Sequence, residues 1–81
     1  MKLPRDLSGE ELVRSLRRHG YSVIRQTGSH IRLSSSIKGG EHHITVPAHK
    51  QLKIGTLAEI LTNVAQYLEI SRDALAQELF D

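Results

Sequence analysis

The stretch YSVIRQTGSHIRLS, residues 21–34, decides the fold, because it contains two strand-like segments joined by a short polar turn. Residues 21–26 are rich in β-branched and aromatic side chains, which favour strands. Thr27 and Gly28 predict a short turn, and residues 29–34 then alternate between polar and apolar side chains. Two strands with so short a connection form an antiparallel pair.

A third strand is predicted over residues 42–47, HHITVP, where Pro47 stops the ladder. Alternation in a strand sends successive side chains to opposite faces of the sheet. One face carries the apolar residues Ile31, Leu33, Ile44 and Val46. The other face carries His30, Arg32, His43 and Thr45. In the first strand, Val23 and Ile24 point to opposite faces, so the pattern leaves open which of them faces the core.

Helices are predicted on both sides of the strands. In residues 7–20, LSGEELVRSLRRHG, Ser8 is placed to cap a helix and Glu11 to complete a capping box. A second helix is expected to open at Thr56, with Glu59 again three residues later. Its apolar stripe consists of Leu57, Ile60, Leu61, Val64 and Leu68.

A short third helix is expected after Ser71, which gives the order α-β-β-β-α-α. Three antiparallel strands are not stable with both faces in water. The two main helices must therefore cover the apolar face of the sheet and leave the face with the histidines open. The fold class is α+β.

The composition limits the classes of protein that fit. A chain of 81 residues is enough for one domain, which we expect to span residues 1–81. There is no cysteine, which excludes a disulfide, a thiol nucleophile and a thiolate metal site and fits a reducing compartment. The sequence has no apolar signal core and no run long enough to span a membrane. We expect a cytoplasmic protein without a membrane partner.

Charge is unevenly distributed along the chain. Residues 1–54 hold ten Lys or Arg against four Asp or Glu, whereas residues 55–81 hold one against five. A basic front half suggests an anionic partner, and nucleic acid is the usual one, although small soluble domains often carry lopsided charge. The basic residues that could follow a phosphate backbone are Arg14, Arg17, Arg18, Lys50 and Lys53. Alternatively, these residues form an ordinary solvated surface without a binding function.

His30 is the strongest candidate for chemistry. Histidine exchanges protons near neutral pH, and RNA carries its own nucleophile in the 2′-hydroxyl, so strand cleavage needs a base, an acid and cations but no metal. Gly28 would let a phosphate backbone approach closely. Candidate cations are Arg25, Arg32 and Lys50. The alternative is an exposed strand histidine without a function, and the residues alone leave both possibilities open.

A metal site or a cofactor site is not indicated. His42, His43 and His49 have an unusual spacing for zinc, and adjacent strand residues point to opposite faces. The sequence contains no glycine-rich phosphate loop of the Walker or Rossmann type. We expect no metal and no cofactor.

The segment LPRDLSGEELVRSLRRHGYSVIRQTGSHIRL, followed by HHITVPAHKQLKIGTLAEIL, resembles the HicA (YcfA-like) toxins of prokaryotic toxin–antitoxin pairs, from about Leu3 to Leu68. The combination of RQTGSH, ITVPAHK and GTL carries the resemblance. It implies a fold similar to double-stranded-RNA-binding domains. It also implies a metal-independent endoribonuclease that cleaves mRNA and arrests translation until a HicB-type antitoxin covers it.

The resemblance also implies roles for individual residues. The catalytic histidine of the family's Gly-Ser-His motif falls on His30. His49 and Lys50 match the loop after the third strand, and residues 69–81 lie in a tail that varies. The expected RNA-binding residues are Gly28, Ser29, Arg17, Arg25, Arg32, His49, Lys50 and Lys53. Two alternatives stay open, a non-catalytic RNA-binding module and a protein-interaction domain that uses the sheet edge and the open face.

Overall fold

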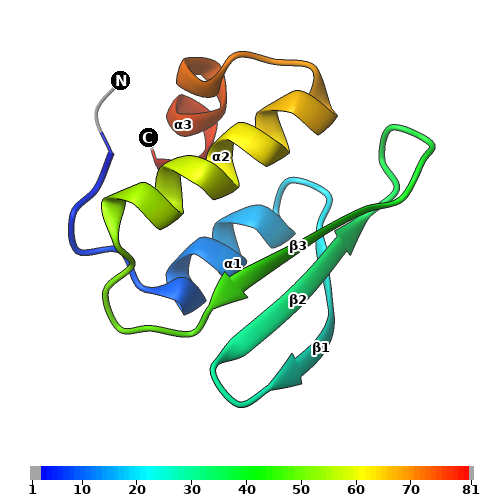
Figure 1. The fold of residues 1–81 in the computed structure, drawn as a ribbon. Helices are drawn as coiled ribbons and strands as arrows, with labels where there is room; N and C mark the ends of the chain where they lie inside the picture. Colours follow the sequence, from blue (N-terminus) through cyan, green and yellow to red (C-terminus); the bar gives the residue numbers. More distant parts are fainter. Residues whose placement is uncertain (1–2, 81) are drawn as a thin grey trace.

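The computed structural model describes residues 3–80, which form one three-stranded sheet and three helices (Figure 1). In chain order the elements are α1 (Gly9–Arg17), β1 (Ser22–Thr27), β2 (His30–Ser35), β3 (His42–Pro47), α2 (Ile54–Leu68) and α3 (Arg72–Phe80). The predicted order and the α+β class are confirmed. The topology is that of a double-stranded-RNA-binding domain, α-β-β-β-α, with an additional C-terminal helix.

The sheet is antiparallel throughout, in the order β1-β2-β3, so β2 is the central strand. His30 pairs with Thr27 of β1 and with Pro47 of β3. The turn between β1 and β2 is therefore Gly28–Ser29, one residue later than predicted. Gly28 has φ of 54°, and a hairpin turn of two residues favours glycine at such a position.

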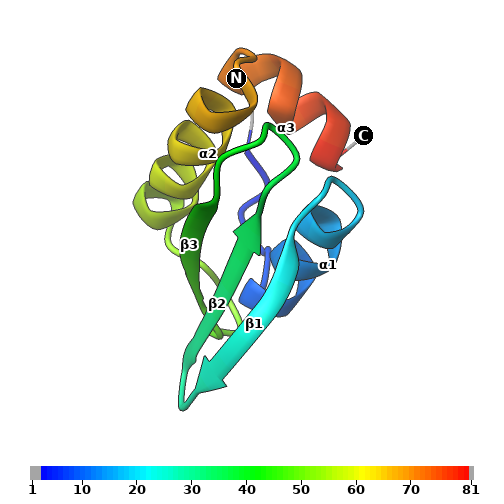
Figure 2. The same ribbon diagram turned by 90° about the vertical axis from the view of Figure 1, so that its right-hand side faces the viewer.

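The helices cover one face of the sheet, as predicted. Ile31, Leu33, Ile44 and Val46 are buried beneath α1 and α2, whereas His30, Arg32, His43 and Thr45 are exposed. Figure 2 looks onto the open face, with α1 behind the β1 side and α2 behind the β3 side. Alternation in two strands was sufficient to predict which side chains face solvent, because β2 and β3 are regular.

Strand β1 is exposed along its whole length. Its register shifts between Val23 and Arg25, so Ile24 lies at an irregularity between two paired residues. Val23 is opposite Leu33 on the helix-facing side but remains 40% exposed, and Ile24 is 50% exposed. Neither apolar side chain enters the core, which resolves the ambiguity in the sequence.

Helix α1 begins as predicted. The backbone N–H of Glu11 donates to Ser8 Oγ at 3.0 Å, and the N–H of Ser8 donates to the Glu11 carboxylate at 2.9 Å. These hydrogen bonds hold the pKa of the Glu11 carboxyl below its usual value. After the helix, Gly20 adopts φ of 98°, which allows the chain to turn into β1.

The predicted start of α2 is wrong. The helix begins at Ile54, two residues before Thr56, and its N-cap Lys53 makes no side-chain hydrogen bond. The chain is positioned instead by Leu52, whose side chain is buried and whose N–H donates to the Leu7 carbonyl at 2.8 Å. Because this contact brings the backbone into place just before residue 54, no capping box is required.

Helix α3 packs on the other two helices through the buried residues Leu75 and Leu79. Ser71 Oγ accepts a hydrogen bond from the N–H of Ala74 at 3.1 Å, so the predicted cap is confirmed. Within residues 3–80, every helix is too short or too polar to cross a lipid bilayer.

Candidate functional site

His30 is the first residue of β2 and lies exposed on the open face of the sheet. Its side chain forms no hydrogen bond or ion pair with any other residue between 3 and 80. It follows directly on the Gly28–Ser29 turn. The imidazole is therefore held on a paired strand while both ring nitrogens remain available to a ligand.

Three segments that are distant in the sequence meet beside this turn. The N–H of Ala48 donates to the Ser29 carbonyl at 2.6 Å, which joins the loop after β3 to the turn before β2. The N–H of Gly9, at the start of α1, donates to the His49 carbonyl at 2.9 Å. His49 and Lys50 are both exposed on this loop. The structure thus brings the predicted residues of the turn and of the loop to one end of the molecule.

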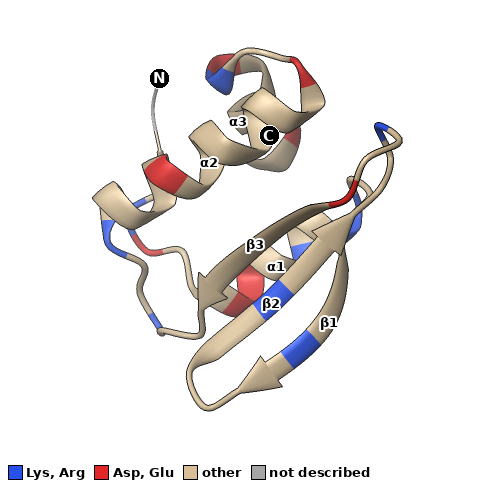
Figure 3. Cartoon of the chain, turned by 45° about the vertical axis from the view of Figure 1, so that its right-hand side comes forward, with Lys and Arg blue, Asp and Glu red and all other residues tan. Residues whose placement is uncertain are grey.

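Two arginines lie on the same open face as His30. Arg25 and Arg32 are cross-strand partners, visible as neighbouring blue segments of β1 and β2 in Figure 3. Arg32 Nη1 donates to Thr45 Oγ1 at 3.2 Å, which orients the guanidinium across β3. Neither arginine pairs with a carboxylate in the described part of the chain. Like charges placed opposite each other repel, so this pair favours binding of an anion.

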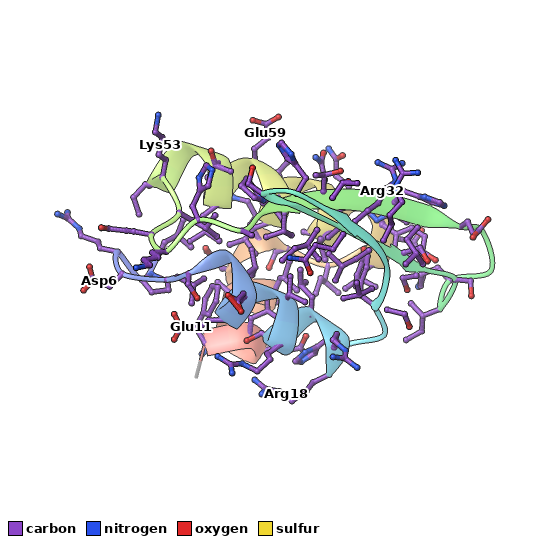
Figure 4. The ribbon with its side chains drawn as sticks, turned by 90° about the horizontal axis from the view of Figure 1, so that it is seen from below. Asp6, Glu11, Arg18, Arg32, Lys53 and Glu59 are labelled. Carbon is purple, nitrogen blue, oxygen red and sulfur yellow. The ribbon has the colours of Figure 1, made fainter. Side chains whose placement is uncertain are left out.

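The remaining basic candidates separate into two groups. Lys53 projects from the start of α2 to the same side of the molecule as Arg32 (Figure 4). Arg17 is in the last turn of α1, in the helical layer, and its neighbour Arg18 points to the side opposite Arg32 in Figure 4. The structure does not bring Arg17 together with His30.

The three histidines considered for a metal do not converge. The Nδ1 atom of His42 is 2.7 Å from the Tyr21 hydroxyl on the helix-facing side, whereas His43 Nε2 is 3.6 Å from Glu41. His49 belongs to the loop after β3. In the part of the chain that the structure describes, no three His, Asp or Glu side chains form a group that could hold a metal ion.

His42 belongs to an aromatic cluster that the sequence did not reveal. Its ring stacks on Tyr67 of α2 at 4.6 Å, and the Tyr67 hydroxyl donates to the Gly40 carbonyl at 2.6 Å. Burial, followed by the charge of His43, lowers the pKa of His42, and burial raises the pKa of Tyr21 to about 12. The Tyr21 hydroxyl therefore stays protonated at neutral pH and shares a hydrogen bond with His42 Nδ1. The cluster fastens the β2–β3 connection to α2.

A second feature that the sequence analysis missed is a polar face of α2. Thr56, Glu59 and Asn63 line a pocket of about 270 Å³ between α2 and the outer edge of β3. Spacings of three and four residues place these side chains on one face of a helix. The spacing of these residues was visible in the sequence, but it indicates a pocket only once β3 is known to lie opposite this face of α2.

Comparison with known proteins identifies the family. Residues 9–65 match a protein family described as the HicA toxin of bacterial toxin–antitoxin systems. The matched segment includes α1, the whole sheet, the loop after β3 and most of α2. Searches of curated proteins and of solved structures found no significant match. Because the family match covers more than half of the chain, and the fold agrees with the one that the resemblance implied, this chain belongs to the HicA toxin family.

Proposed function

We propose that this toxin is a metal-independent endoribonuclease that cleaves mRNA and thereby arrests translation, and that a HicB-type antitoxin neutralises it. One observation carries the proposal. His30 stands exposed at the start of β2, on the same open face as the paired arginines Arg25 and Arg32. A base with unoccupied nitrogens beside two cations without carboxylate partners is what phosphodiester transfer within RNA requires.

In the proposed reaction His30 acts as the general base. Its neutral imidazole removes the proton from a ribose 2′-hydroxyl, and the resulting oxygen attacks the adjacent phosphorus. The bond from phosphorus to the 5′-oxygen breaks, and that oxygen takes a proton from His30 or from a water molecule. The products are a 2′,3′-cyclic phosphate and a 5′-hydroxyl end, so atoms and charge balance without a metal or an oxidant.

The other candidate residues bind and position the RNA. Arg25 and Arg32 stabilise the charge that accumulates on the phosphorane. Apart from Gly28 itself and its two chain neighbours, no described residue has an atom within 4 Å of the Cβ position at Gly28, so a phosphate can approach the turn that it forms with Ser29. Further along the backbone, phosphates are contacted by His49, Lys50 and Lys53. Arg17 is assigned only a peripheral contact, because it belongs to the helical layer.

The test is cleavage of RNA by the purified protein in excess EDTA, with analysis of the ends. We expect cleavage that persists in the chelator and yields 2′,3′-cyclic phosphates. His30→Ala should cleave roughly 10² to 10⁴-fold more slowly. The histidine control is His19→Gln, because His19 lies in the helical layer with its Nδ1 atom 2.8 Å from the Ser15 carbonyl.

Other outcomes would assign a different function. Activity that disappears in EDTA and returns with one divalent ion would show that the mechanism is wrong. Tight RNA binding without cleavage would favour a non-catalytic RNA-binding module that uses the same surface. Failure to bind RNA, together with binding of an antitoxin, would leave a protein-interaction domain.

A further inference from the structure

The pocket between α2 and β3 differs in composition from the open sheet face that carries Arg25 and Arg32. Its α2 wall carries the polar side chains Thr56, Glu59 and Asn63, and Ile60 contributes an apolar surface. Its volume of about 270 Å³ is just below the range for drug-sized ligands, so it suits a smaller group. Glu59 is exposed and forms no hydrogen bond or ion pair with another described residue.

The pocket adjoins the proposed catalytic surface through two residues of β3. Pro47 lines the pocket and is the cross-strand partner of His30. Thr45 also lines the pocket, and its hydroxyl accepts the hydrogen bond from Arg32. Neighbouring strands lie roughly 5 Å apart, so the pocket begins one strand away from the imidazole and the guanidinium. Figure 4 shows Glu59 and Arg32 projecting to the same side of the molecule.

We propose that this pocket binds one unpaired base of the RNA, next to the phosphate that is cleaved, and selects bases that carry an exocyclic amino group. The proposal rests on the proposed function, because it assumes that RNA lies across His30 and Arg32. Single-stranded RNA is recognised through the hydrogen-bonding edges of splayed-out bases. The Glu59 carboxylate can only accept, so it matches the amino groups of cytosine, adenine and guanine. Uracil has no amino group.

Glu59 is the reason to prefer a base over a phosphate as the occupant. A carboxylate repels phosphate, so a groove that served only to follow the RNA backbone would not place an acid without a cationic partner on its wall. The Asn63 amide can both donate and accept, which allows it to bind a second atom of the same base edge. Ile60 is only 6% exposed, so it offers the base a small apolar contact and not a stacking surface.

The test is a binding titration of RNA with the His30→Ala protein, which keeps the RNA intact. One probe is oligouridine, and the others are oligouridines in which one central uridine is replaced by cytidine, adenosine or guanosine. We expect at least one substituted probe to bind roughly 5-fold or more tightly than oligouridine, since one correct base contact discriminates by this much or more. Glu59→Leu in the same background should abolish this preference, because leucine has no hydrogen-bond acceptor, whereas a glutamine amide oxygen would still accept from the amino group.

The direction in which the affinity changes distinguishes base recognition from an effect of charge alone. If Glu59 acted only through its charge, Glu59→Leu would strengthen binding to all probes equally, because a negative charge is removed from the path of RNA. Base recognition predicts instead that the preferred probe loses affinity relative to oligouridine. Glu78→Leu, at an exposed position on α3, is the matched control and should leave the preference intact.

Equal affinity of the His30→Ala protein for all four probes would overturn the proposal, and so would a preference that survives Glu59→Leu. If RNA does not bind in the pocket and the antitoxin covers it, the pocket is a protein interface and the proposal is wrong. The two proposals fail separately. Cleavage without a base preference contradicts only the base pocket, whereas a base preference without cleavage contradicts only the catalytic role of His30.

Discussion

Among single residues, Arg32 and Arg18 provide a matched pair for testing where RNA binds. Both are exposed arginines, but they project to opposite sides of the molecule. If RNA lies on the open face, Arg32→Ala removes one phosphate contact and Arg18→Ala removes none. We expect Arg32→Ala to reduce the slope of log affinity against log salt by about 0.7, the contribution of one contact to a single strand.

The measurement is a titration of single-stranded RNA at several salt concentrations with both variants. Arg18→Ala should give the slope of the parent. A larger loss for Arg18→Ala than for Arg32→Ala would place the RNA on α1 instead of on the sheet.

His42 makes the stability of the fold depend on pH. Burial lowers its pKa in the folded protein below the ordinary value of 6.5, so the unfolded chain binds more protons in the interval between the two values. Stability therefore rises with pH in that interval and falls as the pH drops below about 6.5. We expect the melting temperature of His42→Gln, measured by thermal melts, to fall less across this interval than that of the parent. A parent melting temperature that stays constant from pH 7 to 5 would contradict this prediction.

Among the elements, the start of α1 packs closely against the end of β3. A Cβ added at Gly9 would overlap the carbonyl of Pro47, so Gly9→Ala must displace either the helix or the end of β3. We expect a loss of about 1–3 kcal/mol in the free energy of unfolding, measured by denaturant titration. At Gly55 in α2 a Cβ meets nothing within 4 Å, so Gly55→Ala should stabilise by about 0.5–1 kcal/mol. Equal effects at both positions would contradict the close packing at Gly9.

The accuracy of sequence-based prediction also varied from element to element, for physical reasons. The capping box of Ser8 was predictable because all of its hydrogen bonds are local. Thr56 offered the same local pattern, yet the long-range bond between Leu52 and Leu7 sets the start of α2. Strand alternation predicted the faces of β2 and β3 but could not do so in β1, where the irregularity at Ile24 breaks the period.

The candidate site was likewise predictable only in part. The hairpin motif pointed to His30, and the register then placed Arg25 and Arg32 beside it. The aromatic cluster around His42 was not predictable, because Tyr21, His42 and Tyr67 come from three distant parts of the chain. The pocket beside Glu59 likewise exists only where α2 meets the edge of β3.

At the scale of the whole molecule, membership of a toxin family predicts an effect on growing cells. Expression of this chain alone in a bacterial host should stop growth, and co-expression of its antitoxin should restore it. His30→Ala should permit growth while still binding the antitoxin, because the exposed side chain contributes little to the fold. Growth arrest by His30→Ala, expressed at the parental level, would show that toxicity does not depend on this histidine.

The central claim is that His30 performs chemistry and does not support the fold. It is tested most directly by single-turnover cleavage of RNA in EDTA, with thermal melts of the same parent and His30→Ala preparations. Truncation of an exposed strand residue opens no cavity, so the free energy of unfolding should change by no more than about 0.5 kcal/mol. Loss of the general base should slow cleavage by roughly 10² to 10⁴-fold. Cleavage at the parental rate, or a melting temperature far below that of the parent, would contradict the claim.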